Sequence, residues 1–225
     1  MNVSSGSTTS PAASRQLSPL VYVLDDDDAM RNSLSALLRS VGMEVESFAC
    51  SQELLAALRP DVPGCVILDV RLRGENGLEV RDRMAVRNLK TPVVFLTGYG
   101  DIPMTVKAMK SGARDFLSKP FRDQDLLDAI SHAIDEDRER LLVDRSLDAL
   151  RTSYVSLTPR EREVVGFVVA GLLNKQIAHE MNVCEVTVKM HRGQAMKKMC
   201  SRSVADLVCK IQMLCDQGIV DRKSL

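Results

Sequence analysis

The sequence predicts an α/β domain with a five-stranded doubly wound parallel sheet, joined by a long helical linker to an all-α domain. Short apolar runs alternate with segments of helical periodicity over about residues 20–140, a pattern typical of right-handed βαβ units. Charge is also divided: residues 16–150 carry 17 Lys and Arg against 23 Asp and Glu, and residues 151–225 carry 12 against 7. This division favours two domains, of which the acidic one would meet a cation and the basic one a polyanion.

The composition argues against several classes of protein. The six cysteines form no CxxC pair and have no metal-ligand spacing, so we expect reduced thiols rather than disulfides or a zinc site. No apolar run approaches the roughly 18 residues of a membrane span, and the N-terminus lacks the features of a signal peptide. Residues 1–18 hold eight Ser or Thr without apolar periodicity, and we expect a disordered tail there. The protein is therefore expected in the cytoplasm, with no membrane contact.

The first unit of the expected sheet is a strand, an acidic loop and a helix. The apolar run from Leu20 to Leu24 ends in four consecutive aspartates, and apolar residues then recur at helical spacing up to Gly42. The same alternation continues along the chain. Further strands are expected at 44–48, 65–68, 92–96 and 114–117, and further helices near 51–58, 77–88, 101–110 and from 123.

Polar side chains follow these strands at their carboxyl ends, which meet at one edge of a parallel sheet, where ligands bind. They are Asp25, Asp26, Asp69, Thr97 and Lys119. The set suits phosphoryl transfer to a carboxylate, because magnesium prefers oxygen ligands while an ammonium and a hydroxyl can bind phosphoryl oxygens. The alternative is a solvated acidic cluster beside an ordinary threonine at a strand end.

Four stretches, VYVLDDDDAMR, VILDV, VVFLTG and FLSKPF, resemble the receiver domain of two-component response regulators, a flavodoxin-like fold, over about residues 20–140. The resemblance implies that Asp69 is the phospho-acceptor and that Mg²⁺ is the cofactor. The implied ligands are Asp26 and Asp69 directly, Asp25 through water, and the backbone carbonyl of Arg71. Lys119 would pair with the phosphate, followed by Pro120 in the cis form.

The resemblance also assigns a switch pair, Thr97 and Phe116, in which a hydroxyl moves to the phosphoryl group and an aromatic ring turns inward. Phe116 replaces the Tyr of many relatives, and its ring is still expected to switch. Many members have Met-Pro where this chain has Leu72-Arg73, so the acceptor loop is expected to be looser without losing a ligand. Asp27 and Asp28 match no role in the family.

A helical pattern continues from Asp123 with no Gly or Pro before Thr158. We expect one long helix, or two with a short break near 145–152, acting as a semi-rigid connector. The expected boundaries are an acidic receiver domain at 19–140, a helical linker at 141–154 and a basic domain at 155–225.

The basic domain opens with the capping-box signature Thr158-Pro159-Arg160-Glu161. Two short helices then follow, at 174–181 and 185–199, with a last helix at 203–216. Because a tight turn joins the two short helices and the later one is basic, the pattern indicates a helix-turn-helix, although a basic helix can also be a solvated surface. The basic residues of that helix are Lys189, His191, Arg192, Lys197 and Lys198.

The stretches LTPREREVV, GLLNKQIA and VTVKMHRGQAMKKM resemble the LuxR-type DNA-binding domain of the NarL/FixJ class over about residues 155–218. The resemblance implies a recognition helix at 185–199, with Lys189 and Met190 facing base edges. The other expected DNA-binding residues are Asn174, Lys175, Thr187 and Arg192 at phosphates, together with Gly193 and Lys197. Gly193 either admits the helix close to the groove floor or is merely tolerated. Leu173 and Cys184 stand where relatives commonly have Ser, which weakens a backbone contact and a helix cap.

These features predict a DNA-binding transcriptional response regulator. A sensor histidine kinase would phosphorylate Asp69, which would promote homodimerisation and binding to promoters in double-stranded DNA, with RNA polymerase as a further partner. Dimer contacts are expected on the helix at 101–110, the strand at 114–117 and the helix at 123–140. A phosphatase would usually need a second acid at the position of Arg71. We therefore expect a phospho-acceptor that slowly loses its own phosphate, and not an enzyme. A binding protein that works without phosphate is the other alternative.

Overall fold

The structure is a computed structural model that describes residues 18–98 and 115–221. The tail expected at 1–18, apart from its last residue, and the helix expected at 101–110 lie outside the described residues. The chain forms two compact units, one ending at Leu141 and the other beginning at Leu142.

The first unit is built on a parallel five-stranded sheet with the order β2-β1-β3-β6-β7, which confirms the doubly wound topology. Its strands are β1 (Leu20–Leu24), β2 (Glu44–Phe48), β3 (Gly64–Asp69), β6 (Val93–Thr97) and β7 (Asp115–Ser118). The strands β3, β6 and β7 each end one residue later than the sequence predicted, so that Asp69 and Thr97 are themselves the last residues of β3 and β6.

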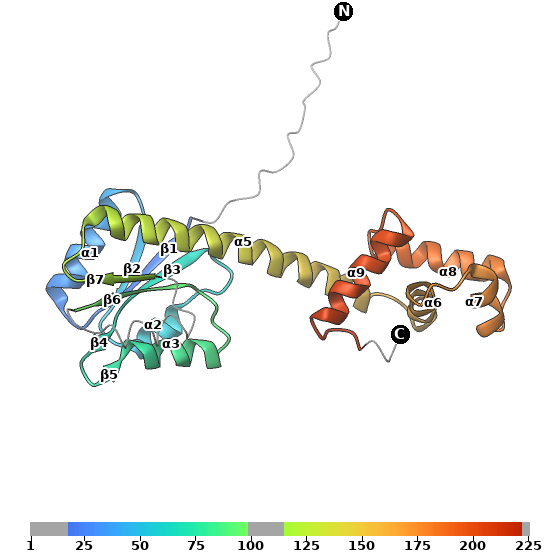
Figure 1. Ribbon diagram of the computed structural model, residues 1–225, viewed down its shortest axis with the longest axis horizontal. Helices are drawn as coiled ribbons and strands as arrows, with labels where there is room; N and C mark the ends of the chain where they lie inside the picture. Colours follow the sequence, from blue (N-terminus) through green and yellow to red (C-terminus); the bar gives the residue numbers. More distant parts are fainter. Residues whose placement is uncertain (1–17, 99–114, 222–225) are drawn as a thin grey trace, which may run out of the picture. The chain divides into compact units, whose positions relative to one another are not determined.

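Helices cover both faces of this sheet (Figure 1). They are α1 (Asp28–Ser40) and α5 (Asp123–Val155) on one face, and α2 (Ser51–Ala57) and α3 (Gly77–Val86) on the other. In β1, Val21 and Val23 belong to the core with α1 and α5, whereas Tyr22 and Leu24 belong to the core with α2 and α3. Both faces are therefore buried, which explains why the three inner strands β1, β3 and β6 are almost entirely apolar.

The α5 helix is continuous from Asp123 to Val155, so no break occurs near 145–152. Within the first unit, the buried carboxylate of Asp137 ties α5 to the sheet, because its Oδ2 accepts a hydrogen bond from Gly64 N at 2.9 Å. Arg140 Nε donates to the other oxygen at 2.8 Å. Gly64 admits no side chain, since a Cβ would lie 2.6 Å from the carbonyl oxygen of Leu20. The start of β3 is thus fixed at the end of the strand opposite Asp69.

The segment after Asp69 was expected to be a loop, but it forms a short antiparallel ribbon of β4 (Arg71–Leu72) and β5 (Glu75–Asn76). Its turn contains Gly74 with φ +84°, a conformation that side chains rarely adopt. The ribbon leads into Gly77, the first residue of α3, where a Cβ would collide with the carbonyl oxygen of Asp69. The chain therefore returns directly against the last residue of β3.

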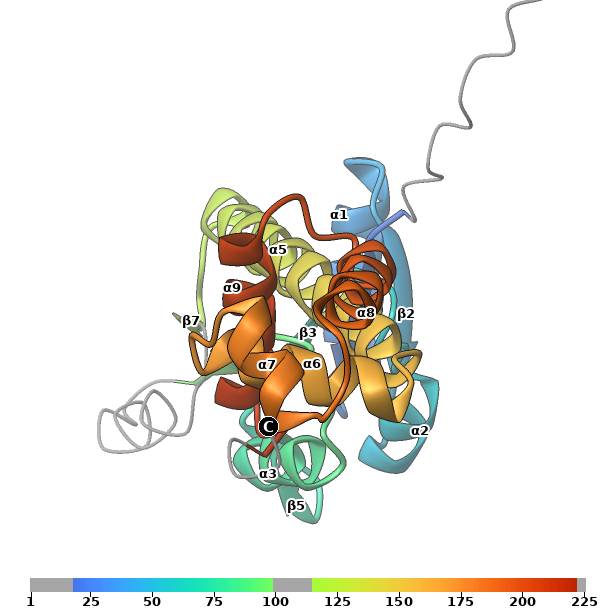
Figure 2. The ribbon, with the colours of Figure 1, turned by 90° about the vertical axis from the view of Figure 1, so that its right-hand side faces the viewer.

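The second unit is helical, as predicted (Figure 2). Besides the end of α5 it contains α6 (Pro159–Val169), α7 (Asn174–Glu180), α8 (Glu185–Lys198) and α9 (Val204–Asp216). These helices share one core, whose fully buried members include Val164, Ile177, Val188, Leu207, Ile211 and Leu214. A four-residue turn joins α7 to α8, which makes the pair a helix-turn-helix. No helix in the described ranges is both long enough and apolar enough to cross a lipid bilayer.

The predicted capping box at the start of α6 is present. Thr158 Oγ1 accepts from Glu161 N at 3.3 Å, and Glu161 Oε2 accepts from Thr158 N at 2.7 Å. Lys198 Nζ, at the end of α8, donates to the same Oε2 at 2.7 Å. Burial alone would raise the pKa of Glu161, but the hydrogen bonds from Lys198 and Thr158 leave that pKa below its usual value. The cap of α6 is therefore also a tether to the end of α8.

Candidate functional site

Three of the predicted site residues meet at the carboxyl edge of the sheet. Lys119 Nζ donates to Asp69 Oδ2 at 2.6 Å and to Asp25 Oδ2 at 3.1 Å. The three residues come from the ends of β7, β3 and β1, which the parallel register brings together. Lys119 N also donates to the carbonyl oxygen of Thr97 at 2.7 Å, and the Lys119–Pro120 peptide bond is cis, as expected. One ammonium thus bridges two buried carboxylates.

Burial sets the electrostatics of this bridge. Burial raises the pKa of Asp25, although a hydrogen bond from Asp27 N and the charge of Lys119 oppose that rise. For Lys119, burial would lower the pKa, but the hydrogen bond and charge of Asp69 and the charge of Asp25 outweigh it, and the pKa is raised. The raised pKa of Lys119 favours its protonated, positively charged form at neutral pH. The raised pKa of Asp25 means that its ionised form is less favoured than that of an exposed aspartate.

Backbone groups orient the other oxygen of each buried acid. Asp25 Oδ1 accepts from Asp27 N at 2.8 Å, and Asp69 Oδ1 accepts from Arg71 N at 2.9 Å. Arg31 Nη1 donates to the carbonyl oxygen of Asp25 at 2.7 Å. Both carboxylates are thus held by two donors each, so that their oxygens are fixed before any ligand binds.

The third predicted ligand, Asp26, is paired differently. Arg73 Nε lies 3.0 Å from Asp26 Oδ2, and the Arg73 side chain is 87% exposed. Arg73 is one of the two residues that depart from the family's Met-Pro, and no role was predicted for it. The acidic site therefore contains two positively charged side chains, Lys119 and Arg73.

The two remaining aspartates of the run have structural roles that sequence reasoning missed. Asp27 is the N-cap of α1, because its side chain accepts from Ala29 N at 2.8 Å. Asp28 begins the helix and pairs with Arg31. The signal was present in the sequence, since an Asp before a helix and another in its first turn are typical of helix N-termini.

The two residues of the expected switch pair lie on adjacent strands. Thr97 is buried at the end of β6, and its Oγ1 donates to the carbonyl oxygen of Gly98 at 3.2 Å. Phe116 on β7 is partly buried and stacks on Phe95, with 5.1 Å between ring centroids. The hydroxyl is therefore turned to its own chain, and the ring packs on the α2 and α3 face of the sheet.

The donor set fits a magnesium ion only after a rearrangement. Within residues 18–98 and 115–221, no three His, Cys, Asp or Glu side chains are gathered as a metal site. Asp25 and Asp69 already converge on one ammonium and offer the hard oxygens that Mg²⁺ prefers. Asp26 would have to leave Arg73, and because solvent reaches the arginine of this pair, the ion pair is worth only about 0–1 kcal/mol. The residues present therefore fit Mg²⁺ once that exposed pair opens.

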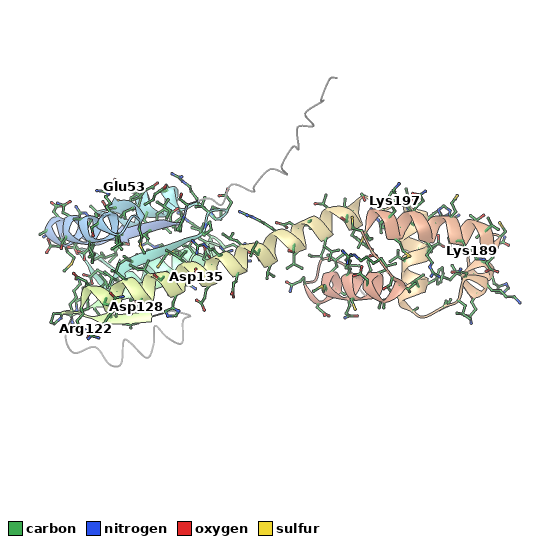
Figure 3. All side chains as sticks on the ribbon, turned by 90° about the horizontal axis from the view of Figure 1, so that it is seen from above. Glu53, Arg122, Asp128, Asp135, Lys189 and Lys197 are labelled. Atoms are coloured by element: carbon green, nitrogen blue, oxygen red, sulfur yellow. The ribbon has the colours of Figure 1, made fainter. Side chains whose placement is uncertain are left out.

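On the helix-turn-helix, the predicted residues divide into exposed and engaged groups. Lys175 and Lys197 are exposed, and Lys189 is exposed with a pair to Glu185 at 3.2 Å. Figure 3 shows Lys189 near the start of α8 and Lys197 near its end. Met190 is also exposed.

The engaged residues are those whose side chains already have a partner within the second unit. Arg192 Nη1 donates to Asn174 Oδ1 at 2.9 Å, which links the two helices. Thr187 Oγ1 lies 3.0 Å from Cys184 Sγ, and neither Leu173 nor Cys184 caps its helix through its side chain. Lys198, one of the basic residues of α8, is turned away to Glu161.

Comparisons with known proteins match both units. Residues 21–131 match the response regulator receiver domain, and residues 155–211 match the bacterial regulatory proteins of the luxR family. The chain is 51% identical over 189 residues to Nodulation protein W of Bradyrhizobium diazoefficiens, covering 84% of this chain and 83% of that protein. It is 43% identical over 197 residues to Response regulator protein TmoT of Ectopseudomonas mendocina, covering 88% and 90%.

A solved structure extends the match to the fold. The response regulator StyR has a TM-score of 0.80 and 45% sequence identity, covering 87% of this chain and 99% of that one. Both the α/β unit and the helix-turn-helix unit are therefore those of known transcriptional regulators. The chain belongs to the DNA-binding response regulators of two-component systems, in which a receiver domain precedes a LuxR-type helix-turn-helix domain.

Proposed function

We propose that Asp69 accepts a phosphoryl group from a sensor histidine kinase and that the resulting acyl phosphate controls DNA binding. The observation that carries this proposal is the bridge at Lys119, whose ammonium lies 2.6 Å from Asp69 Oδ2 and 3.1 Å from Asp25 Oδ2. An ammonium in this position can bind an oxygen of a phosphoryl group on Asp69 and neutralise the added charge. In the transfer, the phosphorus–nitrogen bond of the donor phosphohistidine breaks as the phosphorus–oxygen bond to Asp69 forms.

Mg²⁺ is the cofactor we propose for this transfer, held by Asp26, Asp69 and the backbone carbonyl of Arg71, with Asp25 bound through water. The ion supplies charge neutralisation between the carboxylate and the incoming phosphoryl group. Asp25 supports this assignment, because burial raises its pKa in spite of the Lys119 charge, and a second cation nearby would favour its ionised form. Arg73 would release Asp26 as the site fills.

The residue at position 71 helps to distinguish a protein that only accepts a phosphoryl group from a phosphatase. A phosphatase with an aspartate nucleophile usually has a second acid two residues later as proton donor, and Arg71 occupies that position. We therefore propose that the acyl phosphate is lost only by slow hydrolysis, which would act as a timer of the signal.

Thr97 and Phe116 are the residues we propose as the transmitter of phosphorylation. Thr97 Oγ1 would exchange the carbonyl of Gly98 for a phosphoryl oxygen, and Phe116 would turn into the space that this movement opens. These changes alter the surface of β7 and α5, and we propose that phosphorylated chains dimerise through it. The expected helix at 101–110, part of the same proposed surface, lies outside the described residues.

On DNA, we propose that Lys189 and Met190 contact base edges, that phosphate contacts come from Asn174, Lys175, Thr187 and Arg192, and that Gly193 and Lys197 also lie against the DNA. The exposure of Lys175, Lys189 and Met190 supports their contact with DNA, and the hydrogen bond from Arg192 to Asn174 joins the two helices that would make it. The dimer would bind promoters in the cytoplasm, with RNA polymerase as the further partner.

The test of the acceptor is mass spectrometry after treatment with a small phosphodonor and Mg²⁺. The wild-type chain should gain one phosphate, and Asp69→Asn should gain none, because an amide is neither an adequate nucleophile nor a charged ligand. Asp82→Asn, at an exposed aspartate of α3, is the matched control and should be phosphorylated normally.

Two other results would overturn the proposal. Phosphate on Asp69→Asn at normal yield would move the acceptor to another carboxylate. A wild-type chain that takes no phosphate yet binds DNA would be a regulator that works without phosphate.

A further inference from the structure

The outer face of α8 is defined by the residues that anchor its inner face. Val188 and Ala195 are fully buried in the core of the second unit, seven residues apart on one side of the helix. At about 100° per residue, four positions lie within about 40° of the opposite direction. We call these four residues, Val186, Met190, Gly193 and Lys197, the reading ridge.

The first half of the reading ridge is apolar. Val186 is 74% exposed and Met190 is 54% exposed, and their spacing of four residues makes them neighbours on the helix surface. A single exposed apolar residue needs no explanation, but two adjacent ones at the centre of the face of a helix-turn-helix that meets DNA do. Gly193 follows them, and a Cβ added there would meet nothing within 4 Å, so nothing within the described chain requires a glycine.

The chemistry of the major groove determines what such a ridge can read. Base edges there carry hydrogen-bond donors and acceptors and one apolar group, the 5-methyl of thymine. Val186 has no hydrogen-bonding group in its side chain and, being β-branched, holds its methyl groups in few orientations. Lys189 lies about 100° from the buried direction, on the flank of the ridge, and pairs with Glu185 at 3.2 Å. The apolar side chains are therefore closer to the centre of the face than the lysine.

We propose that Val186, with Met190 beside it, reads a thymine methyl group, so that the preferred site has thymine opposite Val186 in each half. The missing side chain of Gly193 lets the helix approach closely enough for this contact. The proposal rests on α8 being the helix that enters the major groove.

The first experiment is a selection from a random duplex library with the full-length chain, a small phosphodonor and Mg²⁺. It is run in parallel with Val186→Ala and with Val86→Ala, a control at a valine of α3 that is 88% exposed. The wild-type chain and the control should enrich the same thymine in each half-site. Val186→Ala should lose that preference while keeping the rest of the site.

The second experiment removes the methyl group alone. Each thymine of the enriched duplex is replaced in turn by deoxyuridine, and dissociation constants are measured for the same three chains. One replacement per half-site should weaken binding of the wild-type chain and the control by about threefold to tenfold, as expected when the burial of one methyl-sized group is lost. The same replacement should have no effect on Val186→Ala, because the contact has already been lost.

The remaining outcomes overturn either this inference or the function beneath it. Equal sensitivity to deoxyuridine in the wild-type chain and Val186→Ala would show that another residue reads the methyl group. Insensitivity at every thymine would show that the ridge reads no methyl group at all. Retention of no duplex by any chain would instead refute DNA binding, and retention without sequence preference would refute base reading by α8.

Discussion

The acidic edge of the first unit and the reading ridge of α8 differ in whether their side chains already have partners. At the acidic edge, each carboxylate expected to hold magnesium is paired with a cation of the chain. Lys119 bridges Asp25 and Asp69, and Arg73 pairs with Asp26. On the ridge, Val186 and Met190 present apolar surface to solvent.

The two regions therefore represent two kinds of binding site, one whose side chains must exchange partners and one whose side chains gain their first partner from the ligand. At the acidic edge, a ligand must replace an interaction that already exists, so its affinity is a difference between two comparable energies. On the ridge, the core side of α8 holds the helix rigid and the outer side chains gain a partner only on DNA. Substitutions at the acidic edge should therefore change the chemistry of the free protein, while substitutions on the ridge should be silent until DNA is added.

The largest expected effect is at the bridge itself. Lys119→Met removes the ammonium that would neutralise the phosphoryl group, and phosphorylation by a small donor should slow by about 10²-fold or more, as when one preorganised charge donor is lost. The rate is measured by mass spectrometry at saturating Mg²⁺. Lys90→Met, at an exposed lysine of the same unit, should leave the rate unchanged. A normal rate for Lys119→Met would show that the bridge is only structural.

The next largest effect is expected at the buried ion pair between Glu161 and Lys198 in the second unit. Its loss should lower the free energy of unfolding even in the absence of DNA. Glu161→Ala leaves Lys198 without its buried partner and removes half of the capping box, so the second unit should lose about 2–4 kcal/mol of unfolding free energy. Urea unfolding followed by circular dichroism measures the loss, and hydrogen exchange of α6 and α8 assigns it to this unit. Glu163→Ala, at a more exposed partner of Arg160, should cost no more than about 1 kcal/mol.

The same tether should also depend on pH with a definite sign. Because the pKa of Glu161 is lowered from 4.5 in the folded chain, its contribution is fully present above that value and is lost as the pH falls through the folded pKa. Glu161→Ala should therefore unfold with a weaker dependence on pH below about 4.5 than the wild-type chain. Parallel pH profiles of the two chains would contradict this assignment.

On DNA, two lysines should separate affinity from sequence preference. Lys189→Ala should cost about 1–3 kcal/mol on the preferred site and little on scrambled duplex, because a base contact is lost. Lys175→Ala should weaken binding to all sequences alike and lower the salt slope by roughly 1 per monomer, as for one lost phosphate contact. Titrations on both duplexes at several salt concentrations measure these effects. Equal losses on both duplexes for Lys189→Ala would make that lysine a phosphate contact.

The smallest expected effect concerns the exposed pair at the acidic edge. Arg73→Ala frees Asp26, so Mg²⁺ should bind about twofold to fivefold more tightly, in keeping with the small energy of an exposed ion pair. Mg²⁺ titration calorimetry without phosphodonor measures the affinity. Arg59→Ala, which breaks the Arg59–Glu46 pair away from the site, is the control and should not change it. Weaker Mg²⁺ binding in Arg73→Ala would show that Arg73 organises the site instead of competing for it.

Much of the fold and part of the site could be predicted from local patterns. The apolar run before Asp69 predicted a buried strand ending in a carboxylate, and β3 ends there. The capping box at Thr158 and Glu161 was predicted from four consecutive residues and is present. Such features depend on residues close in the chain, whose interactions are the same in most surroundings. The N-cap role of Asp27 was equally local, but Asp27 was compared only with the family's motif, in which it matches no role.

Local sequence patterns were sufficient to predict the five strands of the sheet, the described helices between them, the polar edge of the sheet and the helix-turn-helix, because periodicity and capping depend on neighbouring residues. Which cation pairs with which carboxylate depends on residues far apart in the chain and could be seen only in the folded protein. Lys198 reaches Glu161 across 37 positions, Asp137 reaches Gly64 across 73, and Arg73 rather than another arginine pairs with Asp26. Many residues of the right charge could fill each role, and the choice follows from which backbones the packed core brings within about 3 Å.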